Sequence, residues 1–230
     1  MTAKRFFYDD SYAAGARNNA TRVAICLCVD TSTSMDGEPI NELNRGIQTF
    51  VNELLNDEIA KYSAEIAVVE FNSNAEIKLP FTPVSELKSM KSELVADGLT
   101  AMGAGVRMAI SLLNDRKAYY KQKGIPYYQP WLVLMSDGGP NDEYVSAANQ
   151  AHQLSKNKQL LSIPIGIGSS ARLDVLAQFS ATVPALEIKN NDFKTFFKWL
   201  SASVVNQSRS NKDADFQFDQ KQLGWLKQTS

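Results

Sequence analysis

Apolar runs alternate along most of the chain with segments in which apolar residues recur at helical spacing. The runs that predict buried strands span residues 23–29, 66–71, 131–135, 160–167 and 185–188. The segments that predict helices span residues 40–55, 84–95, 103–113, 143–155, 171–179 and 193–204. Strands that are apolar throughout and are separated by helices predict a parallel sheet that is covered on both faces.

A hairpin is the one predicted exception to the parallel order. Residues 72–74 have turn composition, and residues 75–79 are predicted to pair antiparallel with the preceding strand until Pro80 stops them. We therefore predict a Rossmann-like α/β fold, with an open, mostly parallel sheet, one antiparallel edge strand and helices on both faces. Residues 116–130 are polar and rich in tyrosine, and they are predicted to form an exposed connection.

The composition is that of an ordinary globular protein without a strong charge. Of the 230 residues, 44% are hydrophobic, and 24 basic residues against 25 acidic ones give a net charge of −1. This balance argues against a strongly basic protein that binds nucleic acid or a membrane surface. No apolar run reaches the roughly 18 residues of a membrane span, and residues 1–10 lack the apolar core of a signal peptide, so we predict a cytoplasmic protein.

The chain is expected to contain one domain with an extension at each end. We divide it into an N-terminal extension (1–21), the α/β domain (22–206) and a polar C-terminal tail (207–230). Cys26 and Cys28 alternate on the first predicted strand, so both thiols face the same side of the sheet. Because no further ligands accompany them, we interpret them as small buried core residues rather than as a redox or metal site.

Oxygen-bearing side chains follow the predicted strands where parallel strands end. Asp30, Ser32 and Ser34 come directly after the first strand. Asp137 follows a later strand, and Thr100 lies just before a predicted helix. Each segment alone also fits a helix cap or a turn. Together, at the edge where open parallel sheets bind ligands, they offer two carboxylates and three hydroxyls, which suit Mg²⁺ or Mn²⁺, and Ca²⁺ less well.

These residues resemble the metal-ion-dependent adhesion site of the von Willebrand factor type A domain. The pattern of that family is Asp-x-Ser-x-Ser, then a distant Thr, then an Asp. It falls here on the following residues: Asp30, Ser32, Ser34, Thr100 and Asp137. In the family the two serines are direct ligands, whereas the Thr and the two Asp bind the ion directly or through water.

The resemblance extends to the bacterial TerY/YegL branch of that family, which is associated with tellurium-resistance gene clusters. It covers residues 23–205, and the similar segments are 30–40, 136–142, 164–168 and 192–203. One departure is Thr33, where the family usually has glycine. That position supplies no ligand, so the departure affects the loop backbone rather than the ligand set.

The resemblance implies a non-enzymatic, intracellular module that binds protein partners through its metal. A partner Asp or Glu would occupy the open coordination position, and relatives are encoded beside kinase- and phosphatase-like proteins in stress-response clusters. The charge balance and the lack of a membrane span, separately, predict no nucleic-acid or membrane partner.

Two other functions are compatible with the same residues. A phosphatase of the haloacid dehalogenase type also places an Asp after its first strand and a later Asp-Gly around Mg²⁺. It requires a second Asp two residues after the nucleophile as a proton donor, and Ser32 stands there. The other alternative is a scaffold whose ion only ties loops together, and its partner binding would survive removal of the metal.

Overall fold

The computed structural model describes residues 20–87, 93–210 and 227–228. Within these ranges one sheet has the strand order β3-β2-β1-β4-β5-β6-β7. The strands are β1 (Val23–Asp30), β2 (Ala64–Phe71), β3 (Ala75–Pro83), β4 (Trp131–Ser136), β5 (Leu161–Ile167), β6 (Leu186–Ile188) and β7 (Lys227–Gln228). All neighbouring pairs are parallel except β2 with β3 and β6 with β7. The mostly parallel sheet with its predicted antiparallel edge strand is confirmed, and the short β7 adds a second antiparallel pair at the other edge.

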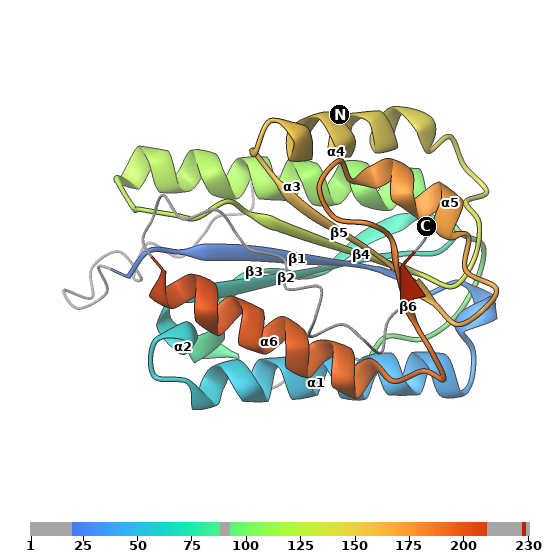
Figure 1. The fold of residues 1–230 in the computed structure, drawn as a ribbon, viewed down its shortest axis with the longest axis horizontal. Coiled ribbons are helices and arrows are strands. Elements are labelled where there is room, and N and C mark those ends of the chain that lie inside the picture. Colours follow the sequence, from blue (N-terminus) through green and yellow to red (C-terminus); the bar gives the residue numbers. More distant parts are fainter. Residues whose placement is uncertain (1–19, 88–92, 211–226, 229–230) are drawn as a thin grey trace.

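The helices form a layer on each face of the sheet (Figure 1). One layer holds α1 (Glu38–Asn56), α2 (Ala60–Ser63) and α6 (Phe193–Arg209). The other layer holds α3 (Met102–Lys123), α4 (Val145–Lys156) and α5 (Leu173–Leu176). Three 3₁₀ turns complete the described elements: η2 (Thr33–Met35), η3 (Val84–Glu86) and η4 (Ala177–Phe179).

The strand order creates a switch point between β1 and β4. The chain passes from β1 outward to β2 and β3, and then returns through α3 to β4 on the other side of β1. Val29 pairs with Met135, so the last residues of the two strands, Asp30 and Ser136, are neighbours. In open α/β sheets this is the place where ligands bind, and we call it the carboxyl edge.

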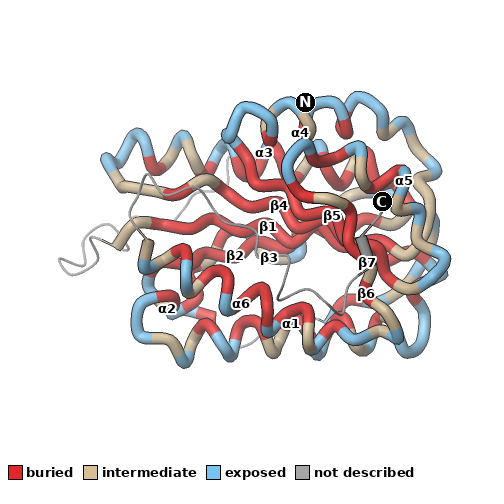
Figure 2. Tube along the Cα trace, viewed as in Figure 1, coloured by how far each residue is buried: buried red, intermediate tan, exposed pale blue. Residues whose placement is uncertain are grey.

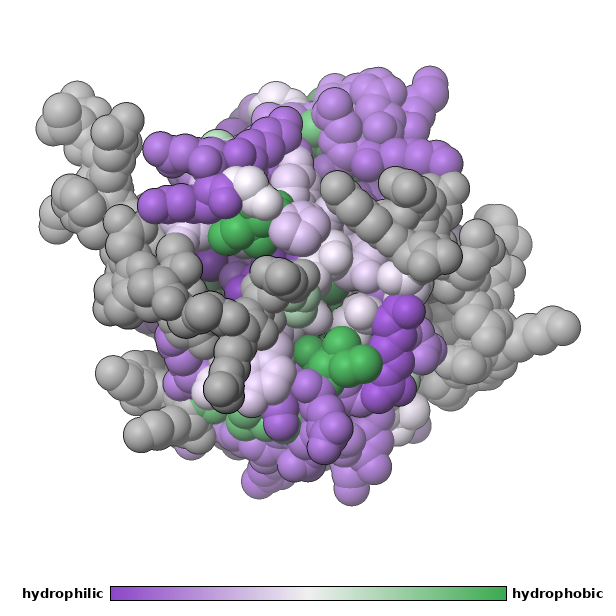
Figure 3. Space-filling model, turned by 90° about the vertical axis from the view of Figure 1, so that its left-hand side faces the viewer, coloured by the Kyte–Doolittle hydropathy of each residue, from purple (hydrophilic) through white to green (hydrophobic). Residues whose placement is uncertain are grey.

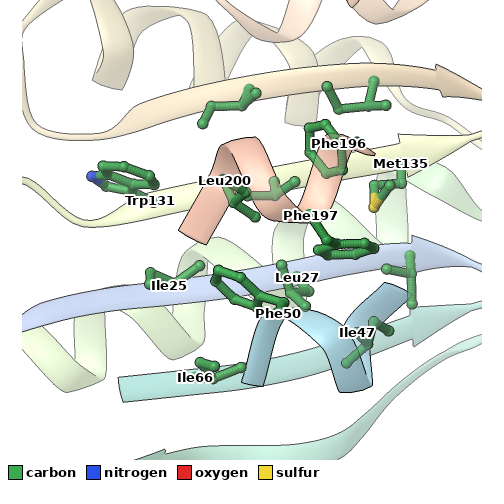
Figure 4. Close-up of a cluster of buried hydrophobic side chains, with 14 of the residues drawn as sticks. Ile25, Leu27, Ile47, Phe50, Ile66, Trp131, Met135, Phe196, Phe197 and Leu200 are labelled. Atoms are coloured by element: carbon green, nitrogen blue, oxygen red, sulfur yellow. The ribbon is translucent and has the colours of Figure 1, made fainter. Parts of the chain in front are cut away.

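Both faces of β1 are buried, because a layer of helices covers each face of the sheet (Figure 2). Ile25 and Leu27 belong to the core beneath α1 and α6, where Phe50 and Phe197 face each other with ring centroids 5.8 Å apart (Figure 4). Cys26 and Cys28 face the other layer, under α3 and α4, and neither forms a disulfide. Both side chains are fully buried, which confirms that they are core residues, and this burial raises the pKa of both thiols.

Three predicted segments differ from the structure, and two of them flank the edge strand β3 or lie within it. In place of a helix over 84–95, only the single turn η3 forms, and residues 93–100 are not helical, whereas residues 88–92 lie outside the described ranges. β3 continues through Pro80 to Pro83, and Pro80 lies where the pairing of β3 with β2 is irregular, between Leu79 and Thr82. An edge strand tolerates proline, because its outer N–H positions have no ladder partner to lose.

The largest correction concerns residues 116–130, which were predicted to be an exposed connection. α3 continues through most of this segment to Lys123, and Arg116 and Tyr120 within it are buried. Both bond to Glu65 on β2, at the amino end of the sheet. The buried carboxylate of Glu65 therefore allows these polar side chains to face the core. The polar composition of the segment had instead indicated exposure to solvent.

Among the described residues that are visible at the amino ends of the strands, hydrophilic and weakly polar side chains predominate and the apolar areas are separate (Figure 3). No helix in the described ranges is both long and apolar enough to cross a bilayer. Most of the predicted extension (1–21) and tail (207–230) lies outside those ranges, so their division from the domain stays a prediction.

Substitution of Gly46 tests the contact between α1 and α6. A Cβ at this position would lie 2.4 Å from Cδ2 of Phe197 and 2.8 Å from Cε2, so the buried Phe197 ring or the helices themselves would have to shift. We expect Gly46→Ala to lower the free energy of unfolding by about 1–3 kcal/mol in urea titrations. Glu53→Ala on the exposed side of the same helix is the control, with an expected change within about 0.5 kcal/mol. An unchanged stability for Gly46→Ala would mean that this contact is not tightly packed.

Candidate metal centre

The carboxyl edge brings the predicted site residues together from three loops. Asp30 ends β1 and is fully buried. Its Oδ1 accepts a hydrogen bond from the backbone N–H of Ser32 at 2.8 Å, and its Oδ2 accepts one from the hydroxyl of Ser136. Ser136 ends β4, so the central carboxylate is held by both strands of the switch point.

A chain of polar contacts connects the first loop to the loop after β4. The hydroxyl oxygens of Ser32 and Ser34 are 3.1 Å apart. The Ser34 hydroxyl donates to Oδ1 of Asp137 at 2.9 Å, across 103 positions of sequence. The side-chain oxygens of Ser32, Ser34 and Asp137 thus form one continuous cluster beside Asp30.

Thr100 is joined through its backbone to Asn141, in the loop that also carries Asp137. Its N–H donates to Oδ1 of Asn141 at 2.5 Å, and its carbonyl accepts the Asn141 N–H at 2.9 Å. Two positions before Thr100, the Gly98 carbonyl accepts both the N–H of Thr33 at 3.1 Å and its hydroxyl at 3.0 Å. The residue that departs from the family pattern therefore ties the first loop to the loop that carries Thr100.

Burial governs the electrostatics of both carboxylates. It raises the pKa of Asp30 to about 6, although the hydrogen bonds from Ser136 and Ser32 act in the opposite direction. Burial also raises the pKa of Asp137, against the hydrogen bond from Ser34. No Lys or Arg in the described ranges forms an ion pair with either group. The two carboxylates therefore lack a cationic partner within the described chain.

The donor set fits a hard divalent cation. Its charged donors are two carboxylates, and the neutral donors nearby are hydroxyl groups, the combination that Mg²⁺ and Mn²⁺ accept. Among the described residues no group of three or more His, Cys, Asp or Glu side chains is placed to hold a metal, so any ion here depends on Ser and Thr oxygens.

Neighbouring acidic residues serve the helices instead of the cluster. The carboxylate of Asp142 accepts the N–H groups of Gly103 and Ala104 at 2.9 and 2.8 Å and so caps the start of α3. Glu143 accepts the N–H of Ser146 at 2.8 Å at the start of α4. Such placement is favourable because a helix N-terminus carries partial positive charge.

Asn141 is the contact that the sequence analysis did not identify. It lies in a turn-forming segment four residues after Asp137, and its partner Thr100 is 41 positions earlier. No local periodicity or motif indicates a contact over that distance. The only sequence signal is that Asn141 lies in segment 136–142, one of the segments on which the resemblance described in the sequence analysis rests.

Comparisons with known proteins agree with this architecture. Residues 24–202 match the sequence profile of the von Willebrand factor type A domain. No curated protein matches the chain in sequence. The von Willebrand factor type A protein from Catenulispora acidiphila is similar in structure, with a TM-score of 0.63 at 16% identity over 81% of this chain and 43% of that one.

Two further solved structures have the same fold. The vWF domain of the type V pili tip protein Mfa5 from Porphyromonas gingivalis gives a TM-score of 0.64 at 13% identity, over 86% of this chain and 99% of that one. The PilB minor pilin from Streptococcus sanguinis gives 0.58 at 13% identity, over 82% and 62%. The chain thus spans less than two thirds of the Catenulispora and PilB chains. Since the matching profile covers most of the chain, this protein belongs to the von Willebrand factor type A domain family.

Proposed function

We propose that this chain is a non-enzymatic protein-interaction module that binds a partner carboxylate through a divalent metal. The residues that would hold Mg²⁺ or Mn²⁺ are Asp30, Ser32, Ser34, Thr100 and Asp137. The observation that carries the proposal is the hydrogen-bonded cluster of Ser32, Ser34 and Asp137 beside buried Asp30. Such a cluster is polar, converges from separate loops and lies at the switch point of the sheet.

The charge of this donor set favours docking over a closed structural site. Two carboxylates balance a divalent ion, and the serine and threonine hydroxyls add no charge. A bound ion would supply a coordination position that water or an incoming Asp or Glu can fill. The buried surroundings of Asp30 strengthen that attraction, because charges interact more strongly where water is excluded.

The cellular setting is the part of the proposal that rests on resemblance. The segments 30–40, 136–142, 164–168 and 192–203 favour the TerY/YegL branch, and with it a cytoplasmic protein of bacterial stress or tellurite resistance. Partners would then include kinase- or phosphatase-like proteins. The structural neighbours named as a pilin and a pilus tip protein support the broader role in protein interaction.

No observation favours the phosphatase alternative. The position two residues after Asp30 carries Ser32, whose N–H and hydroxyl both take part in the polar cluster. A serine hydroxyl does not protonate a leaving group as a carboxylic acid does. We therefore expect no Mg²⁺-dependent hydrolysis of p-nitrophenyl phosphate above the buffer rate.

Removal of the metal separates docking from scaffolding. We expect a partner captured from a lysate by the immobilised full chain in Mg²⁺ to be released by EDTA and recaptured when Mg²⁺ is restored. Ser34→Ala, which removes one proposed ligand from an exposed loop position, should capture less of the same partner. Capture that persists in EDTA would favour the scaffold with a purely structural ion.

A further inference from the structure

Asn141 makes a paired contact with the backbone of one proposed ligand residue. Its side-chain Oδ1 accepts a hydrogen bond from the Thr100 N–H at 2.5 Å. Its backbone N–H donates to the Thr100 carbonyl at 2.9 Å. Asn141 is itself exposed, whereas Thr100 is only 7% exposed. The constraint on Thr100 therefore comes from hydrogen bonds and not from burial of the Asn141 side chain.

The end of β4 and the loop after it, which carries Asp137, contact both other segments that carry proposed ligands. Ser136 bonds to Asp30, and Asp137 accepts the hydroxyl of Ser34. Asn141 adds the contact with Thr100, whose N–H it accepts. Without the Asn141 side chain, the described hydrogen bond that fixes the Thr100 N–H to this loop is lost, while the contacts of Ser136 with Asp30 and of Asp137 with Ser34 stay.

We infer that Asn141 is a positioning residue for the metal centre, which it serves by fixing the backbone of Thr100 without touching the ion. The inference rests on the proposed function, because it assumes that Thr100 supplies a ligand. Mg²⁺ demands near-ideal octahedral geometry, so a small displacement of one ligand residue weakens binding. Loss of such an outer contact typically costs about 10–100-fold in metal affinity.

The chain contains a matched control for this contact. Asn44 on α1 holds the backbone of Leu94 in a similar way: its Nδ2 donates to the Leu94 carbonyl and its Oδ1 accepts the Leu94 N–H, both at 2.9 Å. Leu94 precedes Thr100 in the same connection to α3, but it carries no proposed ligand. Asn44→Ala removes two side-chain hydrogen bonds to a backbone, one more than Asn141→Ala removes, and neither has a link to the metal.

The test is calorimetric titration of the metal-stripped full chain with Mg²⁺, with thermal unfolding measured beside it. We expect Asn141→Ala to bind Mg²⁺ about 10–100-fold more weakly than the unsubstituted chain. Asn44→Ala should keep the affinity even where its melting temperature falls. Asn141→Asp retains the acceptor for the Thr100 N–H, so it should bind within about threefold of the original, a change of under 1 kcal/mol.

The outcomes separate this inference from the proposed function. Unchanged Mg²⁺ affinity in Asn141→Ala, or an equal loss in Asn44→Ala, would overturn the positioning role while leaving the metal centre in place. Failure of Asn141→Asp to recover the affinity would also count against it. If the unsubstituted chain binds neither Mg²⁺ nor Mn²⁺, the proposed centre and the role of Asn141 are both wrong.

Discussion

Asp30→Ala is expected to abolish saturable binding of Mg²⁺ and Mn²⁺ to the metal-stripped protein. The substitution removes one of the two negative charges at the carboxyl edge. A pair of unit charges about 4 Å apart contributes about 4 kcal/mol at the effective dielectric of a protein surface, so a loss of at least about 100-fold in affinity follows. Calorimetric titration with either ion measures this directly.

The fold should survive this change, because Asp30 ends its strand and its partners Ser32 and Ser136 lie in or beside loops. Asp30→Asn is the more conservative variant, since it keeps an acceptor for the Ser32 N–H while removing the charge. Asp36→Ala removes an exposed carboxylate from the same connection and should bind as the unsubstituted chain does. Binding retained in Asp30→Asn would place the ion elsewhere, and global unfolding of both Asp30 variants would argue against a role in docking alone.

Glu65→Gln is expected to destabilise the protein more than any exposed charge substitution, by about 3–5 kcal/mol. The Glu65 side chain is 3% exposed and accepts hydrogen bonds from Arg116, at 2.6 Å, and from the Tyr120 hydroxyl. The Arg22 guanidinium is also buried, with its Nε 3.9 Å from the same carboxylate. Neutralising Glu65 leaves two buried guanidinium groups without this counter-charge, which is costly in a medium that excludes water.

Urea unfolding followed by circular dichroism measures this loss. Glu76→Gln is the matched control, because Glu76 is 67% exposed and pairs with Lys78 at 3.3 Å, so its removal should cost at most about 1 kcal/mol. The folded Glu65 variant should keep its Mg²⁺ affinity, since this cluster lies at the amino end of the sheet. A change as small as that of Glu76→Gln would show that neighbouring groups already compensate the two arginines.

Local pattern was sufficient for the architecture. The run at 23–29 is apolar without alternation, and β1 is indeed buried on both faces. The stripe from Ile40 to Leu55 predicted α1, whose buried face packs against α6. Hydrophobic periodicity succeeds here because burial is repeated every few residues and needs no knowledge of the partner.

Polar residues were less predictable, because their environment depends on distant partners. Arg116 and Tyr120 suggested an exposed connection, yet Glu65, more than 50 positions earlier, allows both to be buried in α3. Asn44 likewise binds the backbone of Leu94 in a segment that was predicted to be helical. In each case a hydrogen bond across the fold outweighed the local preference.

The candidate centre combines both kinds of information. The sequence by itself determined which oxygen donors follow which strands, and the parallel order implied that Asp30 and Asp137 end at one edge. Only the tertiary structure decided that Ser34 contacts Asp137 and that Asn141 fixes Thr100. Strand ends are set by local apolar runs, whereas the approach of two polar groups is set by how separate loops pack, and no short stretch of sequence contains that information.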